Sequence, residues 1–275
     1  MYDFRFGEKK EILRRPEDFL IFVKRLLPRW VNGIPDSECI AIFKALNLIE
    51  EDRKTKPKIY IETGCGASTL ALFLGAVINN GHVYSWDTNG MKGSFLRKVI
   101  LESMCYPLGI NLFDYWTFVG FDSTNRLIGI PVLSELNKKA CFGYFDSWHT
   151  LVHLQNELRC FESVAEDKFI IALDDAYYRK REENYSYINM IRKKMSLKAV
   201  EESEENKCEP FYLEIENYLK KNYRTVNKID DYYKSHYEND IFFEYYSSDR
   251  KAMNEVGMEE RESLAHRFDA WRVSR

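Results

Sequence analysis

The stretch IYIETGCGASTLALFLGA, residues 59–76, decides the fold of this chain. Ile59 and Ile61 stand at alternating positions, which predicts a buried strand. Gly64 and Gly66 then end the strand, and leucine, alanine and phenylalanine follow at helical spacing. Glycine lets the backbone approach a ligand closely, and the first amides of the helix point into the turn. The stretch therefore predicts a cradle for a nucleotide-type ligand.

After this stretch, short apolar runs alternate with amphipathic runs along the chain. The expected strands cover 58–62, 82–87, 115–119, 141–146 and 168–173, and the expected helices cover 67–79, 91–106, 124–138 and 149–165. Alternation of this kind predicts an α/β fold with a Rossmann-like, doubly wound and mostly parallel sheet. One antiparallel strand is expected to complete that sheet.

The chain divides into four expected segments. They are an N-terminal helical segment (1–57), the Rossmann-like core (58–178), a charged, tyrosine-rich helical insertion or lid (179–224), and the end of the core (225–275). Within the last segment we expect strands at 225–229 and 240–247 and a short helix over 257–275. The final strands and helix would complete the core.

Composition excludes several classes of protein. The chain has 275 residues and a net charge of −3, so it offers no basic field for nucleic acid. Its six cysteines contain no C-x-x-C pair, which argues against zinc and disulfide frameworks. The charged N-terminus does not resemble a signal peptide, and no apolar run reaches the ~18 residues of a membrane span. We expect a cytoplasmic protein without nucleic-acid or membrane partners; the sequence also allows a homo-oligomer.

Two acidic residues near the glycine turn bear on the choice of ligand. A dinucleotide dehydrogenase would carry G-x-G-x-x-G, but Thr69 occupies the third glycine position. Glu62 precedes Gly64 by two residues and suits a ligand with a cationic amino group, which a pyrophosphate lacks. Asp87, at the end of the next strand, is placed to accept hydrogen bonds from ribose hydroxyls. A dehydrogenase is therefore disfavoured.

The pattern from Glu62 to Gly66 resembles the first-strand motif E/D-x-G-x-G of the class I S-adenosylmethionine-dependent methyltransferases. The resemblance covers roughly residues 55–180 and includes the order of the acidic strand ends. It implies that the turn holds the methionine part of S-adenosylmethionine. Asp122, after the third strand, is expected near the adenine or, alternatively, as an ordinary turn residue. The cofactor-binding residues that the resemblance implies are Glu62, Gly64, Cys65, Gly66, Ser68, Thr69, Asp87, Asp122, Asp146 and Trp148.

Carboxylates also end two later strands. Asp146 is the last residue of the strand at 141–146, and Asp174 and Asp175 follow the strand at 168–173. The carboxyl ends of parallel strands share one edge of a sheet, so these side chains are expected to converge there. Converging carboxylates repel one another unless they are protonated or bound to a cation, and Mg²⁺ prefers such oxygen ligands. The alternative is that Asp146 caps the helix that follows it.

The later strand ends narrow the resemblance to the catechol O-methyltransferase-like branch, which includes small-molecule and sugar O-methyltransferases. Those enzymes carry D-x-W-K and L-x-D-N, where this chain has Asp146-Ser147-Trp148-His149 and Leu173-Asp174-Asp175. The match implies that Asp146, Asp174 and Asp175 hold the metal, with Asp146 and His149 catalytic and Trp148 beside the cofactor. This chain departs from the branch in having His149 for the lysine base and Asp175 for the asparagine ligand.

The resemblance implies an enzyme that transfers a methyl group to a hydroxyl of a small molecule, with S-adenosylmethionine and Mg²⁺ as cofactors. His149 would accept the proton of that hydroxyl. Its alternative is a packing role in the helix that follows, where His153 would share its face. Two other functions remain open: a metal-independent N- or O-methyltransferase, and a non-catalytic module that binds S-adenosylmethionine.

Overall fold

The strand, turn and helix expected around residues 59–76 are present in the computed structural model. The structure describes residues 8–49, 58–176, 179, 181, 185–199, 208–229 and 268–275. Strand β1 (Lys58–Thr63) ends directly before the glycine turn, and α4 (Ala67–Asn79) begins directly after it. The local prediction from hydrophobic periodicity is confirmed.

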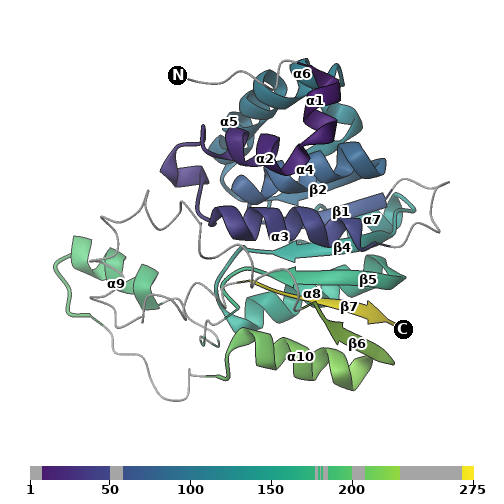
Figure 1. Ribbon diagram of the computed structural model, residues 1–275. Helices are drawn as coiled ribbons and strands as arrows, with labels where there is room; N and C mark the ends of the chain where they lie inside the picture. The colour runs from purple at the N-terminus through teal and green to yellow at the C-terminus, as the bar shows by residue number, and fades with distance from the viewer. Residues whose placement is uncertain are drawn as a thin grey trace.

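Within the described residues, seven strands form one sheet in the order β3-β2-β1-β4-β5-β7-β6 (Figure 1). The other strands are β2 (Gly81–Trp86), β3 (Trp116–Val119), β4 (Ala140–Phe145), β5 (Ala165–Leu173), β6 (Thr225–Lys228) and β7 (Asp269–Ser274). Strands β1 to β5 pair in parallel, whereas β7 is antiparallel to both β5 and β6. The predicted mostly parallel sheet with one antiparallel strand is confirmed.

The strand order reverses at β1, which lies between β2 and β4. In open α/β sheets, ligands bind in the crevice outside the carboxyl ends of the strands at such a switch point. The glycine turn follows β1 at this edge. The topology therefore puts the turn where a ligand site is expected.

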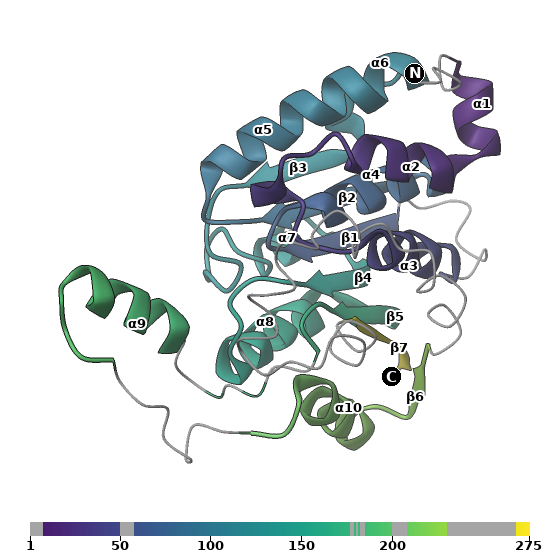
Figure 2. The same ribbon diagram turned by 60° about the vertical axis from the view of Figure 1, so that its left-hand side comes forward.

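Helices cover both faces of the sheet (Figures 1 and 2). One face carries α1 (Lys9–Arg14), α2 (Pro16–Lys24), α3 (Asp36–Asn47), α4, α5 (Gly90–Ile100) and α6 (Tyr106–Leu108), with a π-helical turn (Leu101–Cys105) between the last two. The other face carries α7 (Val132–Glu135), α8 (Leu151–Val164) and α10 (Phe211–Asn222). Along β1, Tyr60 packs toward the first set and Ile59 and Ile61 toward the second. Burial on both faces explains the apolar character of the central strands.

The helix α9 (Tyr185–Lys194) lies apart from these layers in both views (Figures 1 and 2). None of the helices in the described part of the chain has the length and apolar character that crossing a membrane would require.

A buried ion pair fixes the N-terminal segment against the glycine turn. The Lys24 side chain is only 2% exposed, and its Nζ lies 2.9 Å from Asp36 Oδ1. Arg25 donates to Asp36 Oδ2 from both Nε and Nη2, at 3.0 and 2.8 Å. These contacts close the loop between α2 and α3, and that loop brings the Val31 carbonyl to 3.1 Å from the position of a Cβ on Gly66. The N-terminal helices therefore pack against the turn.

Two expected helices were wrong over part of their length. Of the helix expected at 124–138, α7 is the part that forms. The Asn125 side chain accepts the amides of Leu127 and Ile128, and such local bonds compete with a helix. Residues 269–274 form strand β7 instead of a helix, with Trp271 and Val273 on one face of the sheet. The strand expected at 240–247 lies outside the described residues.

Replacing Gly64 with alanine should disrupt the turn. Gly64 has a φ of +79°, and a Cβ there would lie 1.7 Å from the Asp146 carbonyl oxygen, which is backbone and cannot rotate away. We expect Gly64→Ala to lower the free energy of unfolding in urea by at least about 2 kcal/mol. Gly90→Ala is the matched control, because a Cβ at Gly90 meets nothing within 4 Å. Equal unfolding midpoints for the two variants would contradict this description of the turn.

Candidate functional site

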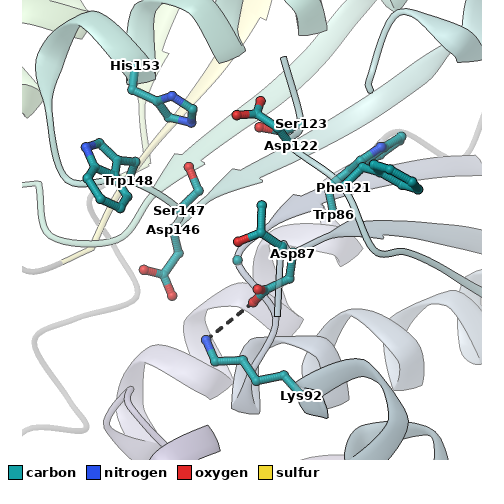
Figure 3. Close-up of a pocket in the computed structure, with 12 residues that line it drawn as sticks. Trp86, Asp87, Lys92, Phe121, Asp122, Ser123, Asp146, Ser147, Trp148 and His153 are labelled. Atoms are coloured by element: carbon teal, nitrogen blue, oxygen red, sulfur yellow. Dashed lines mark ion pairs between the residues drawn. The ribbon is translucent and has the colours of Figure 1, made fainter. Parts of the chain in front are cut away.

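A cavity of about 390 Å³ opens at the carboxyl ends of β1, β2 and β4 (Figure 3). Its lining residues are Gly64, Trp86, Asp87, Thr88, Lys92, Phe121, Asp122, Ser123, Asp146, Ser147, Trp148 and His153. They come from the turn after β1, the start of the β2–α5 connection, the segment after β3, the loop after β4 and helix α8. The cavity lies at the switch point of the sheet, as the topology requires.

Gly64 brings the backbone of the turn directly to the cavity. Its amide donates to the Trp86 carbonyl at 2.8 Å, and the Asp146 amide donates to the Thr63 carbonyl at 2.9 Å. The ends of β1, β2 and β4 are thereby held together without a side chain between them. A ligand in the cavity meets bare backbone at Gly64.

Glu62 lies beneath the turn and does not line the cavity. Its side chain is fully buried, and its carboxylate accepts hydrogen bonds from Ser68 at 2.7 Å, Thr69 at 2.9 Å and Ser85 at 2.5 Å. The direct cofactor contacts expected of Glu62, Ser68 and Thr69 are therefore not what this geometry provides. These residues fix the turn instead, and Thr69 Oγ1 also accepts the Gly66 amide at 3.1 Å.

Burial raises the pKa of Glu62 to about 7, although the hydroxyls of Ser85, Ser68 and Thr69 lower it. The folded state therefore binds a proton at Glu62 more tightly than the unfolded chain does.

Asp87 lines the cavity and also supports the turn. Its Oδ2 accepts the Cys65 amide at 3.0 Å, its Oδ1 accepts the Asn89 amide at 2.7 Å, and Lys92 Nζ lies 3.3 Å from Oδ2.

Cys65 takes part in the turn through its backbone, because its side chain is buried. Burial, followed by the charges of Glu62 and Asp87, raises the pKa of the Cys65 thiol well above its usual value. Neither Cys65 nor Gly66 lines the cavity, and their contact with a cofactor stays a prediction.

Asp122 lies in the cavity wall after β3, as expected. Its Oδ1 accepts the amide and the hydroxyl of Thr124, at 2.7 and 2.6 Å. Burial raises the pKa of Asp122, but these two bonds and the nearby His153 lower it below its usual value overall. Phe121 and Trp148 also line the cavity. Each is about half exposed and offers a flat aromatic face.

His149 forms a pair with Asp175 at the ends of β4 and β5. Its Nδ1 lies 2.9 Å from Asp175 Oδ2, and both side chains are partly exposed. Asp175 has a φ of +47°, which is an uncommon backbone conformation for an aspartate. His149 follows Trp148 in the chain but does not line the cavity itself. A carboxylate at Nδ1 orients the imidazole ring.

The geometry does not support the expected metal site. Among the described residues, no group of three histidine, cysteine, aspartate or glutamate side chains is arranged to hold a metal ion. Asp146 lines the cavity, Asp174 is nearly buried, and Asp175 contacts His149. Sharing an edge of the sheet did not bring the three carboxylates to a common point.

Sequence reasoning did not predict that His153 lines the cavity. Helix α8 begins at Leu151 with Thr150 as its N-cap, so His149 precedes the helix and does not share a helical face with His153. His153 lines the cavity, and its Nε2 lies 3.4 Å from Oε1 of Glu157, one turn later. Ser147 and Ser123, also in the cavity wall, donate to the same Glu157 oxygen. The sequence signal for this contact was a histidine and a glutamate four residues apart, a spacing that brings two side chains together on a helix.

Comparisons with known proteins give likenesses to solved structures. No family model and no curated protein matches the sequence. The apo structure of CalS11, a TDP-rhamnose 3'-O-methyltransferase of calicheamicin biosynthesis, is 16% identical, with 60% of this chain and 78% of that chain covered and a TM-score of 0.41. The human methyltransferase 10 domain containing protein is 12% identical, with 95% and 97% covered and a TM-score of 0.46. At these values the likeness says nothing of activity, which has to come from the cavity.

Glu62 should make stability depend on pH. Between its ordinary pKa of 4.5 and its folded pKa of about 7, the folded chain holds the extra proton, so the free energy of unfolding falls as pH rises through this window. The change is on the order of 3 kcal/mol. The glutamine of Glu62→Gln cannot titrate. As pH falls from 7.5 to 4.5, the free energy of unfolding of the parent should therefore rise relative to that of the variant. Parallel urea-unfolding curves for the two proteins across this range would contradict the assignment.

Proposed function

We propose that this protein is an S-adenosylmethionine-dependent methyltransferase that transfers a methyl group to a hydroxyl of a small molecule. The observation that carries the proposal is the acidic cavity over the glycine turn. Asp87, Asp122 and Asp146 line it, and Lys92 is paired with Asp87. S-adenosylmethionine carries a sulfonium and an ammonium group, which suit such a site, whereas the pyrophosphate of a dinucleotide does not.

The residues of the cavity fit this cofactor. Its volume of about 390 Å³ lies within the usual range for ligand pockets, about 300–1,000 Å³. Gly64 leaves room where a Cβ would not fit, so the backbone can lie against the methionine part. Asp87 is the acceptor for the ribose hydroxyls, and Phe121 and Trp148 supply aromatic faces for the base.

When bound, S-adenosylmethionine supplies a methyl group that an acceptor oxygen displaces from the sulfonium, leaving S-adenosylhomocysteine. The proton that the acceptor hydroxyl loses passes to His149. Asp175, 2.9 Å from Nδ1, orients the imidazole that accepts this proton. The position of the pair at the ends of β4 and β5, next to Trp148, supports this role.

The proposed reaction contains no step through a metal ion, because the carboxylates at the strand ends do not fit one. Proximity, orientation and a general base account for the transfer. A small-molecule acceptor is supported by the net charge of −3, which offers no field for nucleic acid.

The cofactor can be tested by ligand-induced stabilisation. At a hundredfold excess over Kd, S-adenosylhomocysteine should stabilise the folded protein by about 2.7 kcal/mol and so raise its Tm. NAD should not raise the Tm. Asp87→Ala should weaken binding by roughly tenfold or more, because bonds to a charged acceptor are lost. The control is Asp167→Ala, an exposed aspartate on β5 that does not line the cavity. Stabilisation by NAD alone would refute the methyltransferase proposal.

The general base can be tested once an acceptor is found by mass spectrometry in a panel of hydroxylated small molecules. His149→Gln should lower kcat by roughly 10²–10⁴-fold. Asp175→Asn should lower kcat less, because it changes only the residue that orients the imidazole. The variant should fold, since asparagine tolerates the left-handed backbone at this position. Both variants should bind S-adenosylhomocysteine like the parent. His82→Gln, at the amino end of β2, is the control.

Turnover at the parental rate in His149→Gln would exclude the base. Activity that EDTA abolishes and Mg²⁺ restores would show that a metal takes part after all. Binding of S-adenosylhomocysteine without methylation of any acceptor would favour the non-catalytic module.

A further inference from the structure

A buried glutamate organises one end of the cavity. Glu157 is 1% exposed, and its Oε1 accepts hydrogen bonds from Ser123 at 2.5 Å and from Ser147 at 2.7 Å. The same oxygen lies 3.4 Å from His153 Nε2. Glu157 thus joins the segment after β3, the loop after β4 and helix α8. A buried carboxylate of this kind requires donors, and His153 is the one of these three that can carry a positive charge.

The ring of His153 is available to a ligand. It lines the cavity, and among the described residues its Nδ1 makes no hydrogen bond or ion pair. Figure 3 shows His153 near Asp122 and Ser123, on the opposite side of the pocket from Lys92. Asp122 uses Oδ1 for Thr124, and within the described chain Oδ2 has no hydrogen-bond donor. One end of the cavity therefore presents a donor and an acceptor close together.

A donor beside an acceptor matches one edge of adenine. Adenine presents its N6 amino group, a donor, next to N7, an acceptor. With the ribose at Asp87, the base extends toward the part of the cavity that holds Phe121, Asp122 and His153. The charge and hydrogen-bonding pattern at this end are complementary to adenine and not to a base whose exocyclic group accepts.

We propose that His153, held as an imidazolium by buried Glu157, donates from Nδ1 to a ring nitrogen of the cofactor's adenine while Asp122 accepts from its amino group. This proposal rests on the proposed function, and it makes His153 a specificity-determining residue for the base. It also makes cofactor affinity depend on pH, since a neutral imidazole can keep only one of its two donors.

The surroundings of His153 support this pH dependence. Burial lowers the pKa of His153, but the hydrogen bond and charge of Glu157 and the charge of Asp122 raise it above the usual value overall. The charged groups that face it are Glu157 on α8 and Asp122 after β3. The pKa of Asp122 is lowered and that of the Cys160 thiol is raised, so both titrate farther from neutral pH than usual. Affinity should fall as pH rises through the pKa of His153.

Calorimetry with 5'-methylthioadenosine between pH 6 and 9 tests the proposal, because this nucleoside lacks the amino-acid group and its titration. In the parent, affinity should drop about tenfold or more as pH rises. His153→Gln should bind more weakly at pH 6 and show no such drop. Glu157→Gln keeps the imidazole and the same shape, so it should move the midpoint of the drop to lower pH. The control His82→Gln should behave like the parent.

The base itself is tested with 5'-methylthioinosine, in which an oxygen replaces the amino group. It should bind the parent more weakly than the adenosine compound does, and the difference should shrink in Asp122→Asn. Equal pH profiles in the parent and His153→Gln, with S-adenosylhomocysteine still binding, would overturn this proposal alone. Absence of S-adenosylhomocysteine binding to the parent at every pH would overturn the proposed function, and this proposal with it.

Discussion

The structure of the site depends on one buried carboxylate. Glu62, at the end of β1, accepts hydrogen bonds from Ser68 and Thr69 in the first turn of α4 and from Ser85 on β2. These bonds fix the angle at which α4 leaves the strand, and the chain between them turns at Gly64. The carboxylate is costly to bury, and the hydroxyls offset that cost. The acid of the motif thus shapes the turn and lies beneath the cavity instead of lining it.

The carboxylates that do line the cavity are stabilised by donors of the protein. Asp87 accepts the amides of Cys65 and Asn89, and Asp122 accepts the amide and hydroxyl of Thr124. Such bonds stabilise negative charge without a cation. The expected metal site used other carboxylates, Asp146, Asp174 and Asp175, and in the described part of the chain these are not arranged to share an ion. An acidic field held in this way remains available to a cationic ligand.

Sequence reasoning succeeded where the signal was local or followed from topology. The alternation of Ile59 and Ile61 and the glycines after them predicted β1, the turn and α4. Parallel strands then put Asp87, Asp122 and Asp146 at one edge. Sequence reasoning failed where the direction of a side chain mattered. Whether Glu62 points into the cavity or under the turn depends on hydroxyls of α4 and β2, and the helical signal of 124–138 missed the competition from Asn125.

The two histidines near the start of α8 differ in role because the helix begins between them. Because the helix begins at Leu151, His149 lies in the loop and reaches Asp175 beyond β5, whereas His153 lies on the helix and reaches Glu157. Each imidazole is oriented by its own carboxylate. In the proposed function His149 exchanges a proton with the acceptor, and His153 keeps its proton to bind the base. The same residue type can serve both purposes because each partner carboxylate sits on a different part of the fold.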